Sequence, residues 1–169
     1  MKKLNAGVII VQFLGMIILI NGILQLKLYT VSEKVICIRN PFQNQKPHYC
    51  STLFPTREAV LDFWPSVFIW IFFGLLIGIF FVGFLNWKRK LSSGNTILVA
   101  IALYLLLRLK FFRKEIFSHF FRPIREALSD DFGTQCLIEG IIFTVIGLCV
   151  LYYSVNSKYL HSKNDINDH

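Results

Sequence analysis

Four long apolar stretches constrain this chain more than any other feature of its sequence. Each contains 17 to 23 residues, and together they take up roughly half of the 169 residues. A helix of about 20 apolar residues crosses the hydrocarbon core of a bilayer. The rest of the chain is too short to form a soluble domain with its own core. The sequence therefore predicts an integral membrane protein with spans at 7–26, 63–85, 96–112 and 134–155.

The composition excludes several classes of protein. Hydrophobic residues make up 54% of the chain and charged residues only 17%, with a mean hydropathy of +0.55. This is too apolar for a soluble enzyme, a nucleic-acid binder or a disordered tail protein. The net charge of +8 comes partly from cations that flank the apolar stretches, as in Lys88-Arg89-Lys90. Such cations orient helices in a bilayer, so we expect no nucleic-acid partner.

The fold that follows is an all-α membrane protein, a four-transmembrane-helix bundle formed by a single domain over residues 1–169. An even number of spans places both termini on one side of the membrane. Lys2, Lys3 and the cluster at 88–90 indicate that this side is the cytoplasm. The loops at 27–62 and 113–133 then lie outside, and the tail at 156–169 is cytoplasmic.

The third span is the weakest of the four, because Arg108 and Lys110 interrupt its apolar run. From Arg108 to Leu128, apolar residues recur at helical spacings of three and four, with basic residues between them. This pattern predicts an amphipathic extension of the third helix, which Pro123 ends or bends. The extension either lies in the outer membrane interface or contacts a partner protein.

Cys37 and Cys50 are the only cysteines outside the spans, and both fall in the first outer loop. Because the outer compartment is oxidising, they are expected to form a disulfide that closes a 12-residue loop. The alternative is a redox pair in a four-span thiol oxidase. That chemistry favours C-x-x-C with a depressed thiol pKa, and this spacing is absent.

Arg108 and Glu139 are the ionisable residues that fall inside apolar stretches. Charge at membrane depth is costly, so such groups pair or face a protected interior. Both lie toward the outer ends of adjacent spans, which predicts an ion pair between spans three and four. The alternative is an ion or proton pathway.

Small residues in three spans favour close approach of helices, either within the bundle or with another membrane protein. These residues are Gly7, Gly15 and Gly22 in the first span, Gly74, Gly78 and Gly83 in the second, and Gly140 and Gly147 in the fourth.

No nucleophile, phosphate-binding or zinc-protease motif occurs in the sequence. We therefore expect no enzyme activity, no cofactor and no metal.

The order of these parts resembles the claudin-like superfamily, which includes claudins, peripheral myelin and epithelial membrane proteins, and auxiliary subunits of some channels. The resemblance covers nearly the whole chain through short motifs, although the first outer loop here contains no tryptophan. The motifs are Leu28-Tyr29-Thr30-Val31-Ser32 after span one, the Cys37 and Cys50 pair, Thr56-Arg57-Glu58-Ala59 before span two, and Phe120-Phe121-Arg122-Pro123 followed by Gly133.

The resemblance implies a non-enzymatic protein of the plasma membrane that acts in cell contact and junctions or as an accessory subunit of another membrane protein. Its partners would be the lipid bilayer and other membrane proteins, or a second copy, reached through outer loops and glycine-rich helix faces. Arg57 would anchor the start of span two, and Phe121, Pro123 and Gly133 would shape the second outer loop. The rival class is a small transporter or lipid-handling inner-membrane protein, with Arg108, Lys110 and Glu139 lining a polar site.

Overall fold

The computed structural model describes residues 4–39, 47–109, 123, 126–127 and 129–157. Within these residues the regular structure is entirely helical, which confirms the predicted all-α class. Three helices, α1, α4 and α7, are long and apolar enough to cross a membrane, whereas α5 has only 16 residues. The elements are α1 (Ala6–Thr30), α2 (Ser32–Arg39), α3 (Pro47–Leu53), α4 (Arg57–Lys88), α5 (Ser93–Arg108) and α7 (Phe132–Asn156).

The ends of the long helices follow from short polar side chains beside the apolar stretches. A side-chain oxygen at each N-cap accepts a hydrogen bond from a backbone N–H in the first turn, which would otherwise lack a partner. The N-cap residues are Asn5 for α1, Thr56 for α4, Ser92 for α5 and Asp131 for α7. Because Thr56 precedes the second apolar stretch by several residues, α4 begins at Arg57 and carries polar turns beyond the predicted span at 63–85.

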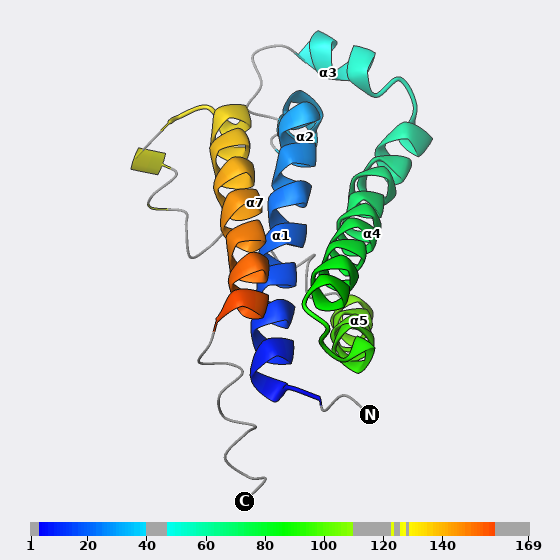
Figure 1. The fold of residues 1–169 in the computed structure, drawn as a ribbon. Coiled ribbons are helices and arrows are strands. Elements are labelled where there is room, and N and C mark those ends of the chain that lie inside the picture. The colour runs from blue at the N-terminus through cyan, green and yellow to red at the C-terminus, as the bar shows by residue number, and fades with distance from the viewer. Residues whose placement is uncertain (1–3, 40–46, 110–122, 124–125, 128, 158–169) are drawn as a thin grey trace, which may run out of the picture.

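Helix α1 is the central element of the bundle (Figure 1). In an apolar 18-residue segment of α1, 56% of the residues are buried, whereas the corresponding shares are 28% for α4 and 33% for α7. Helix α7 packs along one side of α1, whereas α4 and α5 pack against other parts of its surface. The first apolar stretch therefore forms the centre of the bundle, and the other two long helices are less buried than α1.

The interface between α1 and α7 is an antiparallel helix pair with glycine on both sides. Gly15 of α1 lies against Leu151 of α7, and Gly22 lies against Thr144. A step of seven residues toward the C-terminus of α1 therefore corresponds to a step of seven residues toward the N-terminus of α7. Gly147 and Gly140 of α7 lie in the same way against Leu19 and Leu26 of α1. The facing positions on each helix thus follow steps of four, three and four residues, as in a left-handed helix pair.

Helix α4 also runs antiparallel to α1 and contacts it through a narrow stripe. Gly74 lies against Ile20, and Gly78, four residues later, lies against Met16, four residues earlier on α1. Packing of this kind needs small residues because the helices gain little from the hydrophobic effect inside a bilayer. The buried positions along α4 are Phe63, Val67, Ile71, Gly74, Gly78, Val82, Leu85 and Asn86.

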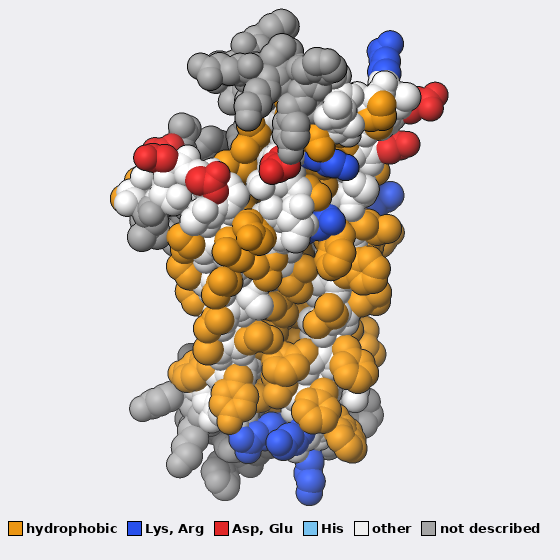
Figure 2. Space-filling model, turned by 90° about the horizontal axis from the view of Figure 1, so that it is seen from above, with side chains coloured by type: hydrophobic (Ala, Val, Ile, Leu, Met, Phe, Trp, Pro, Cys, Tyr) orange, Lys and Arg blue, Asp and Glu red, His pale blue; other side chains and the backbone are white. Residues whose placement is uncertain are grey.

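Figure 2 shows a broad band of hydrophobic side chains between two charged ends of the molecule. One end carries Lys88, Arg89 and Lys90, which follow directly on the last turn of α4. The other end carries both signs of charge, on α2, on the first turns of α4 and just before α7. This arrangement is typical of a protein whose middle part is surrounded by lipid.

Candidate functional site

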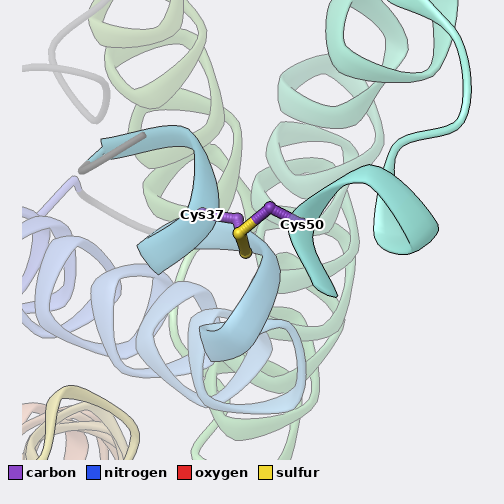
Figure 3. The surroundings of a disulfide bond; sticks show 2 residues. All are labelled: Cys37 and Cys50. Carbon is purple, nitrogen blue, oxygen red and sulfur yellow. A yellow bond between two sulfur atoms is a disulfide. The ribbon is translucent and has the colours of Figure 1, made fainter. Parts of the chain in front are cut away.

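The predicted disulfide between Cys37 and Cys50 is present, with the two Cα atoms 5.6 Å apart. It joins α2 to α3, as Figure 3 shows. Cys37 and Val35 of α2 are buried, and α2 also contacts α7. The bond therefore ties the segment between α1 and α4 to the end of the α1–α7 pair, and in the described residues this segment forms the helices α2 and α3.

Aromatic side chains connect this stapled segment to α4. The Lys34 ammonium lies 5.9 Å from the centre of the Phe54 ring, which meets the Phe63 ring edge-on at 5.6 Å. Lys27 of α1 lies 5.2 Å from the ring centre of Trp70. Cation–π contacts of this kind favour a fixed arrangement of a cation over an aromatic face. The last turns of α1, helix α2 and the first half of α4 therefore form one connected unit.

The residues predicted from the family resemblance occupy different environments. Arg57 is the exposed first residue of α4, and Pro123 is also exposed. Gly133 is buried near the start of α7, where an added Cβ would come within 3.0 Å of Ser32 Oγ. Phe121 lies outside the described residues. The roles assigned to these four residues stay predictions.

Asp131 closes the start of α7 beside Gly133. Its Oδ2 accepts hydrogen bonds from the Thr134 backbone N–H at 2.6 Å and from the Thr134 hydroxyl at 2.8 Å. The backbone N–H of Thr134, with the hydroxyl adding to it, lowers the pKa of the Asp131 carboxyl from its ordinary value. Asp131 is therefore a charged N-cap at neutral pH.

Arg108 and Glu139 differ sharply in exposure. Arg108 is the exposed last residue of α5, whereas Glu139 is buried in α7 with 4% of its surface accessible. The proposed ion pair between them stays a prediction. The rival transporter hypothesis places Lys110 in a polar site with Arg108 and Glu139. Lys110 lies outside the described residues.

Two buried amides and one half-buried threonine join α1, α4 and α5 at the end of the bundle that carries Lys88. Gln12 Nε2 donates to Asn86 Oδ1 at 2.7 Å, and Asn86 Nδ2 donates back to Gln12 Oε1 at 3.2 Å. Asn86 Nδ2 also donates to Thr96 Oγ1 at 2.9 Å. Nearby, the backbone N–H of Asn5 donates to Asn95 Oδ1 at 3.3 Å. We call Gln12, Asn86 and Thr96 the amide cluster.

The amide cluster was not predicted from the sequence, although a signal for it exists. Gln12 and Asn86 are amides in or directly beside long apolar stretches, where an unpaired polar group is costly. Such residues are expected to find partners on neighbouring helices. The pairing of Gln12 with Asn86 depends on how α1 and α4 pack, which the sequence alone does not show.

A second group of buried polar residues lies toward the opposite end of α1. Asn21 and Gln25, one turn apart, are 7% and 4% exposed. Asn21 Nδ2 and Gln25 Oε1 have no hydrogen-bond partner within the part of the chain that the structure describes. Gln25 and Glu139 each directly precede facing residues of the α1–α7 pair, Leu26 and Gly140. In this antiparallel register Gln25 and Glu139 lie within about one helical turn of each other along the pair.

Comparison with known proteins adds no relative to this description. No protein-family model, no curated protein and no solved structure matches the chain. The claudin-like relationship therefore stays a prediction. Within the described residues, no three histidine, cysteine or acidic side chains gather in a way that could hold a metal ion.

Proposed function

We propose that this chain is a non-enzymatic, four-span protein of the plasma membrane that acts as an accessory subunit of another membrane protein. The observation that carries the proposal is the outward face of α4. This helix has 32 residues but is buried along only one stripe. Its other faces present large aromatic side chains, and aromatic residues are enriched in the cores of protein interfaces. The exposed aromatic residues are Trp70, Phe72, Phe73, Phe80, Phe84 and Trp87.

The directions of the helices support a fourth crossing. Because α4 and α7 both run antiparallel to α1, the end of α4 and the start of α7 lie at opposite ends of the bundle. The chain between Lys88 and Phe132 must therefore return from one end to the other. Helix α5 begins this return with 16 residues, about 24 Å at 1.5 Å per residue. The residues of the predicted span at 96–112 that follow Leu109 lie outside the described residues.

Charge and tryptophan positions support cytoplasmic termini. The end that carries Lys88, Arg89 and Lys90 also holds the start of α1 and the end of α7. Short basic segments of this kind face the cytoplasm. Trp64 and Trp87 are 23 residues apart on α4, about 34 Å along a helix, which matches the distance between the two interfaces of a bilayer.

The experiment that tests the accessory role is site-specific photo-crosslinking in the native membrane. A photoreactive side chain at Phe80, which is 80% exposed on α4, is expected to capture one discrete membrane protein. The matched control is the same group at Ile141 of α7, which is 51% exposed and belongs to another face of the bundle. If both positions capture lipid alone, the accessory role fails. Concentration of the protein at contacts between expressing cells, without a captured partner, would favour adhesion at junctions instead.

The second candidate is the small transporter or lipid-handling protein, and one observation favours it. Asn21 Nδ2 and Gln25 Oε1 lack partners among the described residues, in a part of α1 that lies within an apolar helix. Polar groups at membrane depth mark the paths of polar substrates. Replacing Gln25 with leucine would abolish transport in this case and would leave capture of a partner by α4 unchanged.

A further inference from the structure

Three consecutive cations form an exposed basic patch at the turn between α4 and α5. Lys88, Arg89 and Lys90 are all exposed. The acidic side chains of α2, of the first turns of α4 and of the residues before α7 lie at the opposite end of the bundle. Glu139 is buried in the half of α7 nearer that same opposite end. The described carboxylates on the long helices therefore lie too far away to neutralise the patch, because charges beyond about 10 Å are screened by salt.

The turn itself has a defined backbone. The N–H of Leu91 donates to the Asn86 carbonyl at 2.9 Å, and the N–H of Lys90 donates to the Trp87 carbonyl at 3.0 Å. Lys90 has a φ of 55°, in the left-handed region that commonly ends a helix. The backbone that carries Lys88, Arg89 and Lys90 is therefore held in one conformation by hydrogen bonds of the turn.

Arg89 is further positioned by the end of α7. One guanidinium nitrogen, Nη2, donates to Asn156 Oδ1. The other side of that amide, Asn156 Nδ2, donates to the Tyr152 carbonyl at 3.0 Å, which fixes the orientation of the amide. A guanidinium carries five N–H donors, so this bond holds the group and leaves donors for a second acceptor. A planar fork of this kind suits phosphate oxygens.

Trp87 places these cations at the depth of lipid headgroups. The indole is 76% exposed and lies beside Phe84, at 6.3 Å between ring centres, at the margin of the apolar band. Tryptophan prefers the interface between hydrocarbon and water. Lysine side chains one to three residues beyond it reach the phosphate level.

We propose that Lys88, Arg89 and Lys90, with Asn156 as a positioning residue, bind the phosphate of an anionic phospholipid. The phosphate would lie at the α4–α5 turn, where Asn156 in the last turn of α7 holds the Arg89 guanidinium. A lipid fits better than a soluble anion, because the patch borders the exposed Trp87 indole at the margin of the apolar band (Figure 2). Cytoplasmic leaflets carry anionic lipids, which attract basic residues next to a membrane span. The site rests on the membrane location alone and does not depend on the accessory role.

The test measures lipids retained by the full-length protein in detergent, by native mass spectrometry. The protein is offered phosphatidylglycerol, which is anionic, and phosphatidylcholine, which is zwitterionic. We expect retention of phosphatidylglycerol over phosphatidylcholine, and a loss of about thirtyfold in the Lys88→Gln, Lys90→Gln double variant, at about 1 kcal/mol for each cation near the surface. Arg89→Lys keeps the charge but removes the planar fork, and it should reduce retention several-fold.

The matched control is the Lys34→Gln, Arg57→Gln double variant, which removes the same charge at the opposite end of the molecule. It should retain phosphatidylglycerol as the unchanged protein does. Equal retention of both lipids by the unchanged protein would overturn the site. An equal loss in the control, or no loss in Arg89→Lys, would also overturn it, since binding would then depend on net charge alone. Helical circular dichroism of each variant verifies that it is folded.

Discussion

Gly22 of α1 lies directly against the backbone of Thr144 in α7, so that a Cβ added to the glycine would come within 2.6 Å of the threonine nitrogen. No side-chain rotation relieves such a contact, because the obstacle is backbone. The close approach of α1 and α7 therefore depends on glycine at this position. The same holds for Gly147, where a Cβ would come within 2.8 Å of the Leu19 nitrogen.

Gly22→Ala is expected to push α1 and α7 apart and to lower the free energy of unfolding by about 1–3 kcal/mol, the usual cost of overpacking. The measurement is unfolding in mixed micelles followed by helical circular dichroism. Gly83→Ala is the matched control, because the nearest atom to its Cβ would be Thr96 Cγ2 at an ordinary 3.8 Å. An equal loss of stability in both variants would show that the tight α1–α7 contact is not the cause.

Gln12→Leu is expected to destabilise the bundle by about 1–2 kcal/mol, because it leaves the buried Asn86 amide with only Thr96 as a partner. The double variant Gln12→Leu, Asn86→Leu should recover part of this loss, since no amide is then left half-satisfied. A double-mutant cycle in the same unfolding experiment measures the coupling. Strictly additive losses would mean that the two amides do not depend on each other.

The Cys37–Cys50 bond predicts how the protein reacts with a membrane-impermeant thiol reagent applied to intact cells. Both cysteines should be labelled only after mild reduction, because they are bridged and, in the proposed topology, lie on the outer side. Labelling without reductant would contradict the bridge. Labelling only after permeabilisation would place α2 and α3 in the cytoplasm and reverse the proposed topology.

The cap of α7 by Asp131 should depend on pH. The folded-state pKa of this carboxyl lies below its ordinary value of 3.8. Its contribution is therefore fully present above pH 3.8 and is lost as the pH falls through the lower folded value. Hydrogen exchange of the first turn of α7 should accelerate below this pH. Asp131→Asn, which keeps an acceptor without the charge, should remove the pH dependence; if it does not, another group is responsible.

Several features of this protein could be predicted from short stretches of sequence. The apolar runs predict helices because a bilayer requires every backbone polar group to be bonded within its own segment. Polar N-caps such as Thr56 and Asp131 mark where those helices begin. The Cys37–Cys50 bond followed from the oxidising side of the membrane on which the first loop was placed. Helix formation, N-caps and this disulfide depend on short segments of the chain and on the medium around them, so they can be predicted without knowing how the helices pack.

Other features were decided only by the tertiary structure. Hydrophobicity does not distinguish a central helix from a lipid-facing one, because lipid is as apolar as a protein core. The central place of α1, the facing of Gly22 with Thr144 and the pairing of Gln12 with Asn86 each depend on side chains far apart in the chain. The sequence alone determined that apolar helices form and where they begin. Their register and partners were decided by steric fit and by hydrogen bonds that exist only after the helices have packed.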